Sequence, residues 1–99
     1  MRTPIHPGKI LSDELKELDI SARRLAEIID VPPNRIYQII NGKRELTADT
    51  ALRLARYFGT SDEFWLNLQK LYDLDLARRK IGSGLKSIPR RSSSQLTAS

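Results

Sequence analysis

Five short segments of this sequence carry apolar residues at intervals of three or four positions, and this spacing constrains the fold more than any other feature. The segments span roughly residues 7–18, 21–30, 33–41, 47–58 and 60–79. Apolar residues at such intervals lie on one side of a helix, whereas a half-buried strand alternates apolar and polar residues. The sequence shows neither strand-like alternation nor an internal repeat. We therefore predict an all-α fold with five helices.

Residues suited to helix ends separate these segments. Ser21 is a good N-cap for the second helix. Pro33 suits the start of the third helix, because its missing amide hydrogen would be unpaired at that position anyway. Gly42 and Gly59 are natural terminators of the third and fourth helices. The chain is thus divided into helices by its own cap and turn residues.

The second and third helices have clear predicted inner faces. Leu25, Ile28 and Ile29 form the expected buried stripe of the second helix, and Ala26 permits close approach of another helix. Ile36 provides the core contact of the third helix. Two short helices joined by a tight turn allow one helix to cross a DNA backbone while the other enters the major groove.

The charge distribution agrees with such a function but does not establish it. The net charge is +5, from 17 basic and 12 acidic residues. Residues 12–30 hold six acids and three bases, whereas residues 31–44 hold three bases and no acid. A basic patch within a nearly balanced sequence is typical of a nucleic-acid footprint. A solvated basic loop explains the charge alone equally well.

The outer side of the third helix carries polar side chains with the chemistry of base recognition. Arg35 can pair with guanine, and Asn34 or Gln38 with adenine, whereas Lys43 and Arg44 beyond the helix are better placed for phosphates. The alternative for any single residue is an ordinary exposed polar side chain. The presence of the set on one face favours DNA binding.

The fifth helix is apolar in more directions than one side of a five-helix monomer can bury. Thr60 and Glu63 have capping-box spacing at its start. We interpret the excess as a dimerisation helix, at about residues 61–79; the alternative is that its last turns cover more of the core or stay partly exposed. The predicted dimer interface consists of Trp65, Leu68, Leu71, Tyr72 and Leu74.

The composition changes after Lys80. Residues 81–99 contain six serines, two glycines, one proline and three bases without an acid. We expect residues 1–80 to form the helix-turn-helix domain and residues 81–99 to be a disordered basic tail. This tail could be a nonspecific DNA-binding arm, a partner-binding segment that folds on contact, or a solvated end without a selected role.

Several function classes are disfavoured. The absence of cysteine excludes a disulfide framework, and His6, the lone histidine, leaves no cluster with zinc-ligand spacing, so we expect neither metal nor cofactor. His6 with Asp13 or Glu14 is a weak basis for catalysis in a small helical body, so we expect no enzyme. No apolar run approaches the roughly 20 residues that span a bilayer, and no apolar signal segment is present. We expect a cytoplasmic protein.

Longer motifs give a family resemblance over about residues 4–80. The stretch SARRLAEIIDVPPNRIYQIINGKRELTADTALRLARYFG resembles the lambda-repressor-like helix-turn-helix of the Cro/C1-type superfamily. HPGKIL at residues 6–11 and TSDEFWLNLQKLYDL at residues 60–74 are similar to the HigA antitoxin family. The resemblance implies a bacterial homodimer that represses its own operon, associates with the nucleoid when bound to DNA, and neutralises a RelE-like HigB messenger-RNA interferase.

The sequence departs from the superfamily pattern at three positions. Asp30 occupies a turn position where glycine is common, which aspartate tolerates because it adopts positive φ more readily than most residues. Pro32 replaces the usual serine or threonine cap, and Ala22 replaces a glutamine that often contacts phosphate. Arg23 or Arg24 can substitute for these contacts. The DNA-contacting set that the motif and the resemblance together predict is Arg23, Arg24, Pro33, Asn34, Arg35, Tyr37, Gln38, Asn41, Lys43 and Arg44.

The predicted mechanism is a dimer that places two copies of the third helix in successive major grooves, roughly 34 Å apart, on operator DNA. Two alternatives stay open at this point. A solitary repressor of the same family would lack a cognate toxin. A pure protein-binding module would use the fifth helix alone, although the intact basic face of the third helix argues against it.

Overall fold

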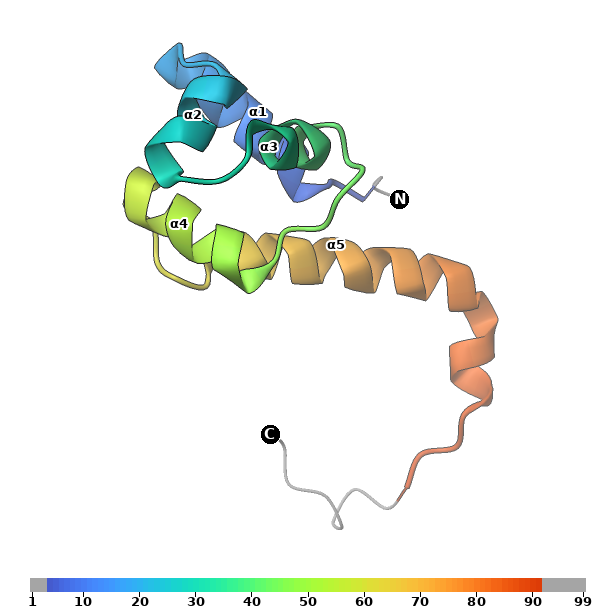
Figure 1. The fold of residues 1–99 in the computed structure, drawn as a ribbon. Helices are drawn as coiled ribbons and strands as arrows, with labels where there is room; N and C mark the ends of the chain where they lie inside the picture. Colours follow the sequence, from blue (N-terminus) through green and yellow to red (C-terminus); the bar gives the residue numbers. More distant parts are fainter. Residues whose placement is uncertain (1–3, 92–99) are drawn as a thin grey trace.

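The computed structural model describes residues 4–91, and within them every regular element is helical (Figure 1). The helices are α1 (Pro7–Leu18), α2 (Ala22–Ile29), α3 (Pro33–Ile40), α4 (Ala48–Phe58) and α5 (Phe64–Ile81), followed by the short 3-10 helix η1 (Gly82–Ser87). This confirms the prediction of an all-α fold with five α-helices. None of the helices in the described part is long and apolar enough to cross a membrane.

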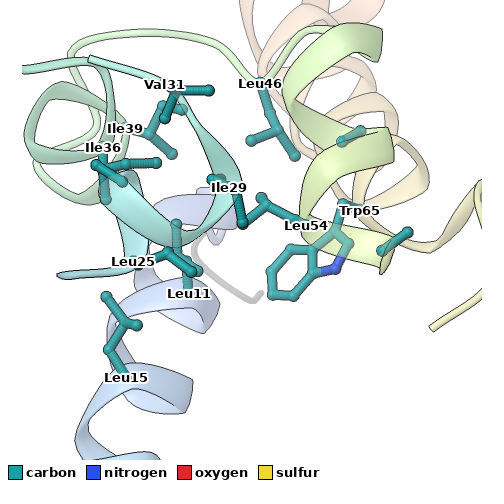
Figure 2. Close-up of a cluster of buried hydrophobic side chains, with 13 residues drawn as sticks. Leu11, Leu15, Leu25, Ile29, Val31, Ile36, Ile39, Leu46, Leu54 and Trp65 are labelled. Carbon is teal, nitrogen blue, oxygen red and sulfur yellow. The ribbon is translucent and has the colours of Figure 1, made fainter. Parts of the chain in front are cut away.

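A single apolar core joins all five helices. Its fully buried side chains include Leu11, Leu25, Ile36, Leu54 and Trp65, one from each helix. Figure 2 shows these side chains converging from α1, α2 and α3 onto α4 and the indole ring. Because each helix contributes at least one residue, the core fixes the orientation of α3 relative to all of the others.

The second helix buries a narrower stripe than predicted. Leu25, Ala26 and Ile29 are buried, but 40% of the Ile28 surface is exposed. An eight-residue helix makes little more than two turns, so the residues spaced by four positions face the core. Ile28 is displaced to the side of this stripe and lies at the surface.

The beginning of α1 explains why histidine, proline and glycine follow one another at residues 6–8. His6 is the N-cap, and its Nδ1 accepts a hydrogen bond from the Gly8 amide at 2.9 Å. A Cβ on Gly8 would lie only 1.8 Å from the Ile39 carbonyl oxygen. Glycine is therefore required for α1 to approach the end of α3 this closely.

The start of α5 differs from the predicted capping box. The Thr60 amide donates to the Ala55 carbonyl at 3.1 Å, so Thr60 closes α4 together with Gly59, which has φ of 74°. The Thr60 hydroxyl donates to the Ser61 carbonyl instead of accepting from an amide of α5. Consequently α5 begins at Phe64, and its N-cap residue makes no side-chain capping bond.

The far end of α5 extends beyond the bundle (Figure 1). The helix continues to Ile81, and η1 occupies Gly82–Ser87. The expected disordered tail therefore begins with helical structure. Arg78, Arg79 and Lys80 complement the dipole of α5 in its last turn. The part of that tail at residues 92–99 lies outside the described residues.

Candidate nucleic-acid interface

A three-residue turn at residues 30–32 connects α2 to α3. Asp30 adopts the left-handed conformation with φ of 61°, as its replacement of the common glycine predicted. The Val31 amide donates to the Ala26 carbonyl at 3.0 Å, and the Val31 side chain is buried. The turn is thus closed both by a backbone hydrogen bond and by an apolar contact.

The side chain of Arg53, in α4, holds this turn through hydrogen bonds to its backbone. Its Nη1 donates to the Ile29 carbonyl at 2.9 Å and to the Asp30 carbonyl at 3.3 Å. Its Nε donates to Asp49 Oδ1 at 3.1 Å. This role of Arg53 could not be predicted from the sequence, since an arginine in the middle of an amphipathic helix carries no local indication of it. The structure makes it the support of the helix-turn-helix.

The third helix separates its core side cleanly from its solvent side. Ile36 and Ile39 are buried, whereas Asn34 is exposed and 45% of the Tyr37 surface is accessible. Gln38 is half-buried beside them. As expected from proline at the cap, the N-terminus of α3 has no side-chain capping bond. The accessible side of α3 therefore offers amides and a phenol, groups that form hydrogen bonds with base edges or phosphates.

The loop after α3 directs two cations to the surface. Asn41 is the C-cap, and Gly42 adopts φ of 72°. The Gly42 amide donates to the Ile39 carbonyl at 3.0 Å, and the Lys43 amide donates to the Gln38 carbonyl at 2.8 Å. These two bonds form a Schellman motif, which reverses the chain at the helix end. Lys43 and Arg44 follow it directly, and both are exposed.

Arg35 is oriented differently from the rest of the predicted DNA set. Its Nη1 donates to Asp49 Oδ2 at 3.3 Å and to Thr50 Oγ1 at 3.5 Å, and 29% of its side-chain surface is exposed. The carboxylate in the first turn of α4 draws the guanidinium toward that helix. In this conformation Arg35 is a bridge between α3 and α4, so its guanidinium must leave Asp49 to reach a base.

The first turn of α2 places two further arginines at the surface. The side chains of Arg23 and Arg24 are 71% and 63% exposed, and both pair with Glu27, at 4.0 and 3.3 Å. Exposed ion pairs of this kind contribute little free energy. Both guanidinium groups are therefore available to another anion. Pro33, the remaining member of the predicted set, is half-buried at the first position of α3.

The side chains of Gln69 and His6 link α5 to the loop that carries Lys43 and Arg44. The buried Gln69 accepts a hydrogen bond from the Leu46 amide through Oε1 at 2.7 Å and donates from Nε2 to Asp73 Oδ1 at 2.9 Å. The His6 ring packs edge-on against Tyr72, with centroids 4.9 Å apart. Burial lowers the pKa of His6 below its ordinary value. The Asp73 carboxylate and a hydrogen bond with the backbone of Arg44 act in the opposite direction but do not outweigh burial.

The predicted dimer face of α5 must be redefined. Trp65 is only 1% exposed and packs against Phe58 at 5.4 Å between ring centroids, so it belongs to the core of one chain. Leu68 and Tyr72 are half-buried within that chain. Leu71 and Leu74 remain, because they lie on the sides of α5 that the bundle leaves uncovered. The helix α5 does carry apolar residues on several sides, but some of them are buried within the core of the same chain.

A groove of about 810 Å³ runs beside this exposed face. It lies between α5 and residues 45–48, and Leu66, Leu74 and Ala77 contribute to its apolar part.

The described residues contain no group of three or more side chains able to hold a metal ion.

Comparison with known proteins agrees with this geometry. The family model described as Helix-turn-helix matches residues 11–65. An addiction module antidote protein of the HigA family from Coxiella burnetii is 52% identical and superposes with a TM-score of 0.86, over 92% of this chain and 99% of that one. The chain is a helix-turn-helix protein of the HigA family.

Two further relatives are similar over most of their length. The Pseudomonas aeruginosa antitoxin HigA, solved with the higBA promoter, is 42% identical with a TM-score of 0.84, over 91% of this chain and 99% of that one. Virulence-associated protein I of Dichelobacter nodosus is 51% identical over 76 residues, which are 76% of this chain and 70% of that protein. The family resemblance noted in the sequence is confirmed.

Proposed function

We propose that this HigA-type chain is a sequence-specific DNA-binding antitoxin that represses its own operon as a dimer. The observation that carries the proposal is the solvent side of α3, where Asn34, Tyr37 and Gln38 lead into the exposed cations Lys43 and Arg44. A similar HigA was solved with promoter DNA. The family is a DNA-binding class, and no catalytic step is proposed.

In the proposed complex, α3 enters the major groove and its polar side chains contact base edges. Lys43 and Arg44 neutralise phosphates next to the groove, and the arginines at the start of α2 neutralise phosphates on its other side. The fastening of the turn by Arg53 keeps α2 and α3 at a fixed angle, so that both sets of contacts form together.

Dimerisation is proposed through the exposed apolar side of α5. Leu71 and Leu74 are 57% and 42% exposed in the single chain, and the helix extends beyond the bundle. Pairing two such faces would remove this apolar surface from water. It would also place two copies of α3 for successive major grooves of one operator.

The proposed toxin is a HigB-like messenger-RNA interferase, by analogy with the HigA relatives; a solitary repressor is the alternative. The test has two arms that separate these functions. Gel retardation of the chain's own upstream region against a scrambled duplex measures operator binding, and preferential retardation is expected. Co-expression with the adjacent gene product measures neutralisation, and we expect a stoichiometric complex and restored growth. Operator binding without either effect would leave the solitary repressor.

A further inference from the structure

An apolar groove lies between α2 and α4, and of its lining residues only Arg53 enters the function proposed above, as the support of the helix-turn-helix turn. The groove measures about 570 Å³ and is lined by Ile28, Ile29, Leu52, Arg53, Arg56 and Tyr57. None of these residues belongs to the predicted DNA-contacting set or to the exposed face of α5. Figure 1 shows α2 and α4 at the opposite end of the molecule from the free end of α5. Pairing through α5 therefore leaves the groove open.

The groove gathers several exposed apolar side chains in one place. Ile28, Leu52 and Tyr57 are 40%, 51% and 37% exposed, and they come from two neighbouring helices. Side chains of this kind, gathered in one place and bordered by charge, are typical of a protein interaction site. A groove between two helices also matches the way in which amphipathic helices are bound by other proteins.

The charges around the groove indicate what fits it. No carboxylate is among its lining residues, all of which lie in the described part of the chain. The guanidinium of Arg53 already donates hydrogen bonds to Asp49 and to the carbonyls of the helix-turn-helix turn. Arg56 is exposed and forms no ion pair within residues 4–91. It therefore offers a guanidinium at the edge of an apolar surface.

We infer that this groove binds an acidic amphipathic helix of another protein. Ile28, Leu52 and Tyr57 receive the apolar side chains of that helix, and Arg56 pairs with one of its carboxylates. The chain's own residues 81–99 are a poor occupant, because they contain three bases and no acid. The inference stands independently of the proposed operator and toxin binding.

The test uses the full chain and a synthetic helical peptide with leucine on one face and glutamate on the other. A matched peptide carries lysine in place of glutamate. We expect the glutamate peptide to shift the NMR signals of Ile28, Leu52 and Tyr57 and to bind more tightly than the lysine peptide. Arg56→Glu should lower the affinity for the glutamate peptide by about tenfold and raise the affinity for the lysine peptide, since like charges at an interface repel. Leu52→Asp should abolish the binding of both.

Arg78→Glu is the control, because this exposed cation lies near the end of α5, outside the groove. It should leave peptide affinity unchanged. Equal affinity for the two peptides, or shifts confined to Leu71 and Leu74, would overturn the inference. So would a loss of self-association in Leu52→Asp by sedimentation, which would assign the groove to a second copy. Shifts of the groove signals on removal of residues 92–99 alone would assign it to the chain's own end.

Discussion

Asp49 accepts a hydrogen bond from Arg35 at 3.3 Å, so a carboxylate of α4 restrains an arginine that extends from α3. This pair reduces the positive charge that the helix-turn-helix can present. We predict that Asp49→Asn, whose amide oxygen can still accept from Arg53 Nε, increases DNA affinity several-fold and steepens the dependence of log affinity on log salt by about one unit, as expected for one additional cation in contact with DNA. Fluorescence anisotropy over a salt series measures both quantities.

The control for this change is Asp62→Asn, an exposed acid in the turn before α5. It removes the same charge without touching Arg35. An equal steepening in both variants would mean that net charge, and not release of Arg35, is responsible. An unchanged slope in Asp49→Asn would show that the ion pair does not restrain DNA binding.

The contact of Gly8 with the Ile39 carbonyl predicts a large loss of stability for Gly8→Ala. The added methyl group would lie 1.8 Å from that oxygen, and both atoms belong to packed helices. We expect the free energy of unfolding to fall by roughly 2–3 kcal/mol in urea denaturation. Gly59→Ala is the matched control, since it has φ of 74° and open space around it. It should cost about 1–2 kcal/mol from backbone conformation alone. A smaller loss for Gly8→Ala than for Gly59→Ala would contradict the packing argument.

The depressed pKa of His6 predicts a pH dependence of stability. Burial lowers the pKa below 6.5, so the unfolded chain binds the proton more readily than the folded one. The stabilisation by neutral His6 is complete above pH 6.5 and is lost as the pH falls through the lower folded value. Protonation also removes the Nδ1 acceptor that caps α1. Urea denaturation at several pH values checks this dependence.

His6→Asn provides the control, because asparagine can cap a helix but does not titrate. It should retain the cap and flatten the stability profile between pH 5 and 7. A profile identical to that of the unmodified chain would assign the pH dependence to other groups.

The sequence contained most of the information about where helices begin and end. Ser21 acts locally through the hydrogen bond that its hydroxyl accepts, and Gly42 and Gly59 act through a positive φ that the absence of a Cβ permits; each is found where predicted. The predicted capping role of Thr60 is wrong, because a threonine after a glycine can close one helix or open the next. The choice depends on which carbonyl its amide reaches, here that of Ala55.

The candidate site was predictable as a set but not in its internal contacts. The polar side of α3 follows from periodicity, whereas the orientation of Arg35 depends on Asp49, fourteen positions away. Likewise, the pattern of α5 shows that Trp65 is apolar but not whether it faces its own bundle or a partner. The packing of Phe58 against it decides this. Contacts between distant segments require the tertiary structure.

If the exposed side of α5 forms the proposed dimer interface, a charged residue introduced there should disrupt the dimer. Leu71→Asp and Leu74→Asp should each shift the sedimentation profile toward monomer and weaken operator binding, because an unpaired carboxylate would be buried in the interface. Folding should be unaffected, since both positions are exposed in the single chain. Leu52→Asp, on α4, serves as the comparison and should sediment like the unmodified protein. A profile unchanged by both α5 substitutions would count against this interface.

The central claim, that α3 selects the DNA sequence, is tested most directly by the affinity for the chain's own upstream region divided by that for scrambled DNA. Gln38→Ala should lower this ratio by about 5- to 150-fold, the equivalent of one lost base contact of about 1–3 kcal/mol. Lys43→Ala should weaken both duplexes alike and reduce the salt slope by about one unit. If Gln38→Ala instead weakens both duplexes equally and leaves the ratio unchanged, α3 does not select the sequence.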